Sequence, residues 1–254
     1  MGGKNCRCDI VNRYYYDLHI HSCLSPCGDD DSTPNNIAGM ATLCGLNIVA
    51  LTDHNTCKNC PAFFEAAKKY GIIPVAGMEL TTSEDIHVVC LFEELSDAMA
   101  FDEFVDKGRM KIKNKPEIFG RQTVTDGDDN PIFEVDALLI NSSGISIDDV
   151  CEIVGRFNGI CYPAHIDRDA NGIVAILGTV PMDIGFTRLE LRDRESTDEY
   201  SKKYGIKKEQ FVYSSDAHYL TDMRDKDAYF ELEDEPYSSK LVRHNLFLRL
   251  RGDL

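Results

Sequence analysis

Hydrophobic residues along the chain gather in short, nearly continuous runs, and the segments between these runs have the spacing of amphipathic helices. Such runs are typical of strands in a parallel sheet that is buried on both faces. About seven strand and helix units are predicted, with polar residues at the C-terminal strand ends, which favours a barrel. An open doubly wound sheet is the alternative, but no glycine-rich nucleotide loop follows the first strand. The predicted strands cover residues 14–21, 47–54, 72–79, 86–92, 159–165, 188–191 and 211–218.

The alternation of strands and helices is broken once, at residues 108–145. Within this segment, QTVT and IFEV flank DGDDNP, a pattern that predicts a hairpin. We interpret the segment as an insertion, which is either a flap over the functional site or an ordinary surface hairpin. The length of 254 residues otherwise fits a single α/β domain over residues 1–254, with a disordered tail at about residues 1–12.

The chain is acidic, with a formal net charge of −16 and an isoelectric point of about 4.8. A protein that binds nucleic acid normally presents a basic face that displaces phosphate counterions, and no dense cluster of Lys and Arg is identified here. We therefore expect no long nucleic acid as a partner. A small phosphorylated substrate is compatible with the charge, because bound metal ions invert the field locally.

No apolar run approaches the ~20 residues of a membrane span, so we expect no membrane partner. The N-terminal stretch MGGKNCRCDIVNR lacks the apolar core of a signal peptide. These two features predict a cytoplasmic location, in which the ten cysteines stay reduced. The sequence predicts no particular oligomeric state.

Six of the seven histidines stand at or near predicted strand ends, together with two acidic residues. His19 and His21 alternate along the first strand and therefore point the same way, with Asp17 placed to steady a ring from behind. Most of the group would meet at one rim of a barrel, whereas His87 would have to reach in from the start of its strand. The group consists of His19, His21, His54, Glu79, His87, His165, Asp216 and His218.

Several of these residues have a structural explanation when each is taken alone. His54 could cap the following helix, Glu79 could be a surface carboxylate, and His87 could fill the core. Burying so many ionisable groups in one place is costly, however, unless cations pair with them. The combination therefore favours a metal site over a coincidence of structural histidines.

Several short motifs together resemble one known family. These are DLHIHS, LTDH, the strand end Gly77-Met78-Glu79, His87, PAHIDR and SDAH. They resemble the PHP (polymerase and histidinol phosphatase) family of metallophosphoesterases, over roughly residues 14–92 and 159–220. The resemblance implies a distorted seven-stranded (β/α) barrel, similar to a TIM barrel, with a cluster of two or three divalent metal ions.

The resemblance also implies which residues bind each ion, with Glu79 shared between two positions. The first position would be held by His19, His21, Glu79 and Asp216. The second would be held by Glu79, His87 and His165. The third would be held by His54, His218 and one ligand from the loop after the first strand.

That loop departs from the family pattern. Ser25-Pro26-Cys27-Gly28-Asp29 stands where the family has Ser-Asp-Gly, as if three residues were inserted. Counting back from Pro34 places Asp29 at the position expected for the acidic ligand. Cys27 and Asp30 are the alternatives.

Imidazole and carboxylate ligands suit Zn, Mn or Fe, and the sequence does not choose among these metals. Two bridged ions lower the pKa of a shared water, which can then attack phosphorus. Arg168, three residues after His165, is the candidate phosphate clamp, because a guanidinium group binds phosphate bidentately. The alternative for Arg168 is a surface salt bridge to Asp167 or Asp169.

These features predict a metal-dependent phosphatase or phosphodiesterase that acts on a small phosphorylated metabolite such as a nucleotide. A histidinol-phosphate phosphatase is an alternative within the same chemistry. A regulatory module that binds metal without turnover is the alternative from another class. An amidohydrolase is disfavoured because no lysine stands at a strand end to bridge the metals, and a DNA exonuclease is disfavoured by the net charge.

Overall fold

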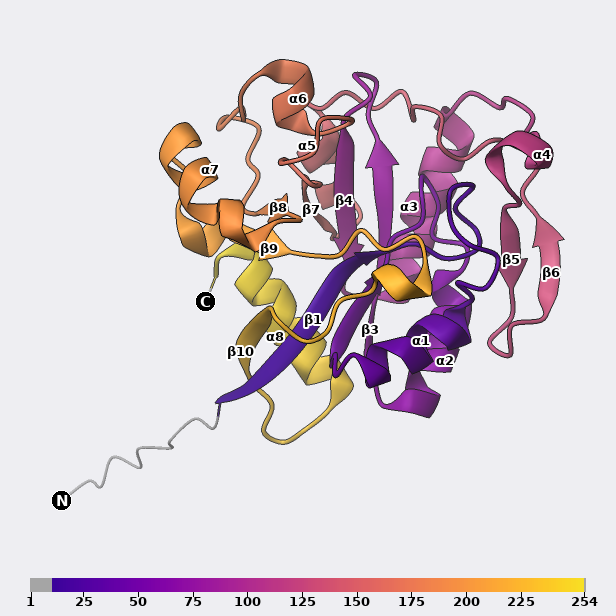
Figure 1. The fold of residues 1–254 in the computed structure, drawn as a ribbon, viewed down its shortest axis with the longest axis horizontal. Helices are drawn as coiled ribbons and strands as arrows, with labels where there is room; N and C mark the ends of the chain where they lie inside the picture. The colour runs from indigo at the N-terminus through magenta and orange to yellow at the C-terminus, as the bar shows by residue number, and fades with distance from the viewer. Residues whose placement is uncertain (1–10, 254) are drawn as a thin grey trace.

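The computed structural model describes residues 11–253, and its centre is a curled six-stranded sheet with the strand order β10-β1-β2-β3-β4-β7 (Figure 1). The tail predicted at residues 1–12 lies outside the described residues except for residues 11 and 12, which begin β1. The strands of this sheet are β1 (Val11–Ile20), β2 (Ile48–Leu51), β3 (Ile73–Thr81), β4 (His87–Phe92), β7 (Ile160–Pro163) and β10 (Tyr229–Glu233).

A second, parallel pair of strands, β8 (Leu189–Leu191) and β9 (Phe211–Tyr213), closes the barrel. The chain just after β9 returns to β1 through a bridge between Ala217 and Ile20. On the other side, the backbone N–H of Ile166, beyond the end of β7, donates to the Glu190 carbonyl oxygen at 2.9 Å. The seven predicted strands therefore form the expected distorted barrel, and β10 extends the sheet beyond β1.

Two strands depart from the parallel arrangement, β10 at the edge of the sheet, which runs antiparallel to β1, and β4 within the barrel. β4 runs antiparallel to both β3 and β7, with Thr81 opposite His87. A tight turn makes the reversal, in which Thr82 N–H donates to the Ile86 carbonyl oxygen and Asp85 adopts a φ of 63°. A parallel crossover needs a dozen or more residues, so this short connection allows only an antiparallel pair. The expectation of an all-parallel sheet is wrong at β4, and the start of β4 consequently lies at the rim where β3 and β7 end.

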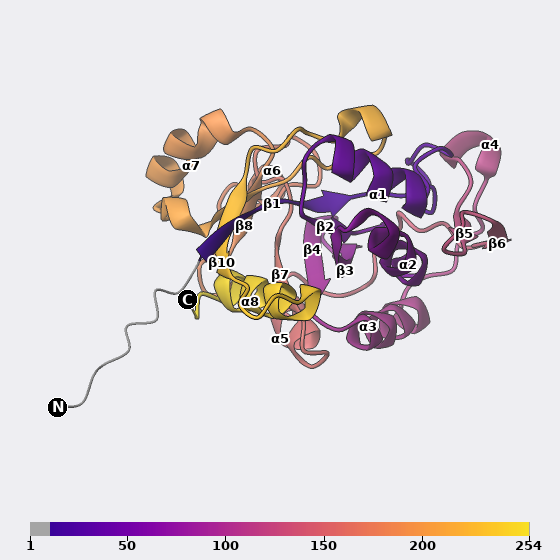
Figure 2. The same ribbon diagram turned by 90° about the horizontal axis from the view of Figure 1, so that it is seen from below.

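Helices cover both faces of the curled sheet (Figures 1 and 2). One core joins α1, α2, α3 and α5 to outward-facing strand residues such as Leu51, Met78 and Cys90. A second core joins α8 to residues of the opposite face such as Val75 and Val89, so α8 closes the end of the barrel away from the strand-end histidines. The helices outside the insertion are α1 (Pro34–Leu43), α2 (Cys60–Tyr70), α3 (Leu95–Gly108), α5 (Val150–Gly155), α6 (Ile173–Leu177), α7 (Thr197–Tyr204) and α8 (Ser239–Arg251).

The insertion contains α4 (Pro116–Phe119) and a hairpin of β5 (Thr123–Thr125) and β6 (Pro131–Glu134). The hairpin tip lies against α1 and α2, because Asp129 accepts hydrogen bonds from Thr33 and Asn35, and Lys69 pairs with Asp128. The tip therefore packs on helices and does not form a flap over the strand ends. Among the described residues, no helix is both long enough and apolar enough to cross a membrane.

Candidate metal centre

The buried carboxylate of Glu79, near the end of β3, lies at the centre of five imidazole rings. Its Oε1 atom is 2.8 Å from His87 Nδ1, 3.0 Å from His165 Nε2 and 3.3 Å from His19 Nε2. Its Oε2 atom is 2.9 Å from His54 Nδ1 and 3.3 Å from His21 Nε2. Glu79 is completely buried. The two oxygens of one carboxylate thus face two different sets of histidines.

A second carboxylate, that of Asp216 in the loop after β9, completes the cluster. Its Oδ1 atom lies 3.4 Å from His21 Nε2 and 3.6 Å from both His19 Nε2 and His218 Nδ1. Potential ligand atoms fall into three groups within which all lie less than 4.8 Å apart. The groups are His19, His21, Glu79 and Asp216; His54, Glu79 and His87; and His21, His54 and His218.

The polar atoms of this cluster fit cations better than they fit one another. His54 Nδ1, Glu79 Oε2, His87 Nδ1 and Asp216 Oδ1 are buried and lack a hydrogen bond to any described residue. Buried polar atoms are rarely left in this state without a specific reason, and an ion is one such reason. The donor set of imidazole and carboxylate is that of a transition-metal site.

The electrostatics within the cluster favour positive charge beside the two carboxylates. Burial alone would lower the pKa of His19 and His21, but neighbouring carboxylates raise the pKa of His19 well above its usual value and that of His21 to about 9. Burial lowers the pKa of His54 to about 4 and that of His218 to about 3. The rings of His19 and His21 therefore carry protons that a metal ion must displace. The rings of His54 and His218 are neutral and can coordinate a metal directly.

Outer hydrogen bonds fix two of the histidine rings. His19 Nδ1 lies 2.9 Å from Glu190 Oε1, and both side chains are fully buried. His21 Nδ1 lies 2.9 Å from Ser25 Oγ, which donates to Asp53 Oδ1 at 2.7 Å. In metal sites, such partners hold a ligating imidazole in one orientation and one tautomer.

The partner of His19 differs from the sequence-based expectation. Asp17 contacts neither ring, because its Oδ1 atom accepts backbone N–H groups of His19 and Ser215. The carboxylate behind the ring belongs to Glu190 on β8, which the sequence analysis missed. The available signal was a single acidic residue between Leu189 and Leu191 in the predicted strand 188–191.

The backbone around the cluster is strained at three residues. His165, Asp216 and Asn55, which directly follows His54, have φ values of 28°, 54° and 52°. Asn and Asp adopt this left-handed region more readily than other residues with a side chain, so the strain is largest at His165. His165 and Asp216 lie just beyond the ends of β7 and β9, where the chain leaves the barrel strands.

The loop after β1 contains Asp29, the predicted acidic ligand of the third metal position. Asp29 donates its backbone N–H to the His218 carbonyl oxygen at 3.0 Å, but its side chain accepts the N–H of Asp31. None of the three ligand groups found among residues 11–253 includes Asp29, Cys27 or Asp30. The metal role of Asp29 therefore stays a prediction without a matching cluster.

Arg168 lies at the mouth of the cluster. Its Nη1 atom is 3.0 Å from Asp216 Oδ2, the oxygen that faces away from the histidines, and its side chain is 40% exposed. The expected alternative partners were Asp167 and Asp169, and the observed partner is neither of them. The Arg168 guanidinium group is therefore partly exposed to solvent and adjacent to the cluster.

The sequence profile of the PHP domain matches residues 17–206, a span that contains most of the cluster. The chain belongs to the PHP domain family. This assignment confirms the predicted family.

Two relatives of this PHP domain match part of its sequence at more than 30% identity. An uncharacterized protein of Methanocaldococcus jannaschii is 32% identical over 100 residues, which are 36% of this chain and 58% of that protein. A 5′-3′ exoribonuclease of Haemophilus influenzae is 37% identical over 79 residues, which are 30% of this chain and 28% of that protein. The matched part is thus less than two thirds of either relative.

Solved structures share the fold at low sequence identity. The lesion-specific endonuclease Q of Pyrococcus furiosus has a TM-score of 0.60 at 17% identity, covering 95% of this chain and 56% of that chain. A structure from Bifidobacterium adolescentis, described as that of a metal-dependent phosphoesterase, has a TM-score of 0.56 at 17% identity. The similarity covers 92% of this chain and 96% of that chain.

The expectation that a long nucleic acid is excluded as a partner is wrong. A further structure of endonuclease Q, with a TM-score of 0.59 and 18% identity over 95% of this chain and 57% of that chain, holds a 27-mer duplex with an abasic lesion at the active site. Net charge is a sum over the whole surface, whereas a phosphate responds to the local field near the site. A net charge of −16 therefore does not decide the size of the substrate.

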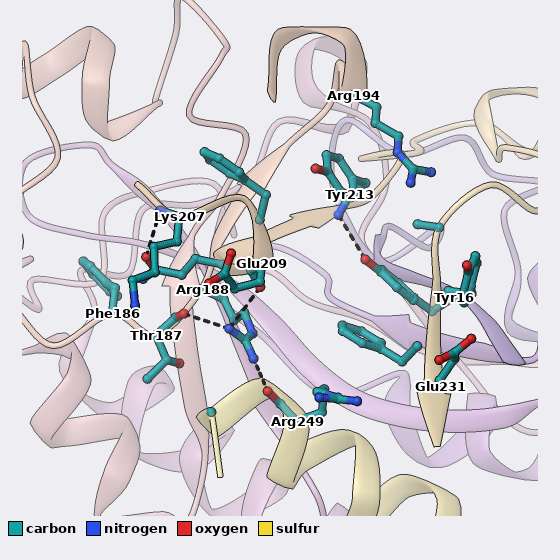
Figure 3. Close-up of a pocket in the computed structure, with 16 residues that line it drawn as sticks. Tyr16, Phe186, Thr187, Arg188, Arg194, Lys207, Glu209, Tyr213, Glu231 and Arg249 are labelled. Atoms are coloured by element: carbon teal, nitrogen blue, oxygen red, sulfur yellow. Dashed lines mark hydrogen bonds between the residues drawn. The ribbon is translucent and has the colours of Figure 1, made fainter. Parts of the chain in front are cut away.

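A cavity of about 850 Å³ in this PHP domain is lined by residues that lead into β8 and β9, such as Arg188 and Glu209, and by residues of β10 such as Glu231 (Figure 3). Arg188, which directly precedes β8, is buried there and donates to the backbone oxygens of Thr187, Glu209 and Arg249. Because Arg249 lies in the last turn of α8, this guanidinium satisfies a carbonyl group at the helix end. The cavity side of β8 and β9 thus contacts α8, whereas Asp216 of the histidine and carboxylate cluster follows the other end of β9.

Proposed function

We propose that this PHP domain hydrolyses phosphodiester bonds of nucleotides or nucleic-acid strands with the help of divalent metal ions bound by the histidine and carboxylate cluster. The observation that carries this proposal is the buried Glu79 carboxylate, whose two oxygens face two separate sets of imidazoles. A carboxylate in this position suits a bridge between two ions. The proposed ligands are His19, His21, His54, Glu79, His87, His165, Asp216 and His218, with Zn, Mn or Fe as the metal and Asp29 as a possible additional ligand.

When two or three such ions are bound, they supply Lewis acidity and an activated water for attack on phosphorus. The residues of the chain orient this chemistry. Glu190 and the Ser25 and Asp53 pair hold the His19 and His21 rings in fixed orientations. Arg168 is placed to bind a non-bridging phosphate oxygen, because its exposed guanidinium lies beside Asp216 at the mouth.

Elemental analysis of the purified chain, followed by a substrate panel, tests the proposal. The panel contains bis(p-nitrophenyl) phosphate, nucleoside monophosphates, histidinol phosphate, and single-stranded DNA and RNA oligonucleotides. We expect bound transition metal and hydrolysis of diesters. Hydrolysis of monoesters alone would support a small-metabolite phosphatase instead, and metal binding without any turnover would support a regulatory module.

The variant Glu79→Gln is the sharpest probe of the bridging role. It should lower turnover by several orders of magnitude, because losing the shared charge removes the paired ions that activate water. Glu93→Gln is the matched control, since Glu93 also contacts a histidine, His244, but at the surface and outside the cluster. Near-normal turnover of Glu79→Gln would refute the role assigned to this carboxylate.

A further inference from the structure

The segment that leads into the inserted hairpin concentrates positive charge in an otherwise acidic protein. Residues 107–121, here called the basic ridge, contain six of the 27 Lys and Arg residues and a single acidic residue, Glu117. The expectation that the chain contains no dense cluster of Lys and Arg does not hold for this segment. The basic residues are Lys107, Arg109, Lys111, Lys113, Lys115 and Arg121.

Half of these charges are already balanced by nearby carboxylates. The pairs are Lys107 with Glu103, and Arg109 and Lys111 with Asp106. In the part of the chain that the structure describes, no carboxylate forms a salt bridge with Lys113 or Lys115. Arg121 is 3.8 Å from Asp30, and both of these side chains are more than half exposed. Three cations of the basic ridge are therefore free, or nearly free, to bind an anion.

The backbone presents these cations along one edge. Asn114 N–H donates to the Asp136 carbonyl oxygen at 2.7 Å, and Lys113 forms a bridge with Ala137, so the segment is extended. Alternate residues of an extended segment share a face, which places Lys111, Lys113 and Lys115 on the same side. Asn114, between them, is buried and anchors the segment.

Exposed apolar side chains accompany the charges. Their exposed fractions are 70% for Met110, 47% for Ile112, 65% for Ile118 and 36% for Phe119. Apolar and aromatic side chains beside cations are what single-stranded nucleic acid requires, because its bases stack while its phosphates bind the positive groups. The same composition also suits an anionic membrane surface.

The position of the basic ridge next to the metal cluster favours nucleic acid over a membrane. The Asn114 side chain donates to the Gly120 carbonyl oxygen at 3.0 Å, and Gly120 packs so closely on the loop after β1 that an added Cβ would lie 2.5 Å from the Pro26 carbonyl oxygen. Pro26 follows Ser25, which bonds to the His21 ring. The basic ridge is thus joined to the loop that supports a proposed metal ligand, while α7 lies at the far side of the molecule (Figures 1 and 2).

We propose that the basic ridge binds the phosphodiester backbone of a single-stranded nucleic acid and guides the strand to the metal cluster. This inference rests on the proposed function and adds to it a class of substrate and a surface that recognises it. Lys113, Lys115 and Arg121 contact phosphates, and Ile118 and Phe119 contact bases.

The test compares Lys113→Gln/Lys115→Gln with a control of equal charge, Lys202→Gln/Lys203→Gln, whose exposed lysines lie on α7. The probe is a fluorescent thymidine oligonucleotide of about 12 nucleotides, in the range of single-strand sites. Its phosphorothioate linkages slow hydrolysis while the metal-loaded full chain binds it. Fluorescence anisotropy then gives Kd as a function of salt.

Each lysine contact with a phosphate contributes a slope of about 0.7 in log K against log salt. The variant in the basic ridge should therefore bind about 25-fold more weakly at 0.1 M salt, with a slope shallower by about 1.4. The control should bind as the unaltered chain does. Hydrolysis of bis(p-nitrophenyl) phosphate should be unchanged in both variants, because neither alters the cluster.

Unchanged oligonucleotide binding by the variant in the basic ridge would overturn the inference, as would an equal loss in the control. Binding to phosphatidylserine vesicles but not to the oligonucleotide would overturn it in favour of a membrane. Hydrolysis of the small diester without oligonucleotide binding would refute the inference and leave the proposed function intact. Oligonucleotide binding through the basic ridge without hydrolysis of any diester would refute the proposed function alone.

Discussion

Replacing Glu190 by glutamine tests whether the carboxylate behind His19 controls metal affinity. Glu190 Oε1 accepts a hydrogen bond from His19 Nδ1 at 2.9 Å and another from the backbone N–H of His165 at 3.0 Å. One oxygen therefore orients two proposed ligands, although Glu190 itself is too far along the chain to be recognised by spacing. Glutamine keeps the size of the side chain and one carbonyl oxygen, but it replaces the other oxygen with an NH2 group and removes the negative charge.

The expected loss of metal affinity follows from the position of Glu190 behind the His19 ring. Partners behind a ligating histidine typically contribute 10–100-fold to metal affinity, and the complete burial of both His19 and Glu190 excludes water as a substitute. This range corresponds to about 1.4–2.7 kcal/mol of binding free energy. Without its negative partner, the His19 ring is a poorer donor to a cation.

Competition with a chromophoric chelator measures the effect on metal dissociation constants at fixed pH. The matched control is again Glu93→Gln, which removes a carboxylate from a surface histidine. Circular dichroism and thermal unfolding of the metal-free proteins check that the substitution leaves the fold intact. A Glu190→Gln affinity within about twofold of the unaltered chain would refute the reasoning, because the lower limit expected from this contact is tenfold.

Two further predictions concern protons and phosphate. Metal loading at pH 7 should release protons, since the raised pKa of His19 and of His21 (about 9) keeps both rings protonated and a metal must displace those protons. Metal affinity should accordingly rise from pH 7 towards pH 9 and fall as the solution is acidified. Calorimetry in buffers of different ionisation enthalpy counts the protons released on metal binding. A count of zero would contradict the positive charges assigned to His19 and His21. Arg168→Gln should mainly raise KM for a phosphoester, because the half-exposed guanidinium beside Asp216 would no longer bind phosphate; steady-state kinetics that give unchanged KM and kcat would leave Arg168 as a surface ion pair only.

Much of the cluster was readable from the sequence because its residues follow strand periodicity. The alternation in LHIH places His19 and His21 on one face, and the other strand-end histidines and acids gather wherever parallel strands finish at a common rim. These are local rules, and the structure brings all eight predicted cluster residues together around Glu79 and Asp216. The barrel itself was predictable for the same reason, since buried strands have a distinctive composition.

The same local rules were wrong for Asp17 and gave no matching cluster for Asp29, where the backbone becomes irregular. The register between β1 and β2 shifts between Asp17 and Ile20, so Asp17 does not follow the alternation that holds for the two histidines. The loop after β1 has no periodicity, and the assignment of Asp29 by counting residues finds no ligand cluster around it among the described residues.

The sequence by itself determined which histidines and carboxylates gather in one cluster, because residue type and strand period are properties of short segments. Only the tertiary structure decided that Glu190 supports His19, that β4 is reversed so that His87 reaches Glu79, and that the basic ridge packs against the loop after β1. These contacts join segments that are far apart in the chain or that depend on how a turn directs it. Their geometry arises only when the barrel closes, because burial in a shared core sets the final positions of segments that no local pattern connects.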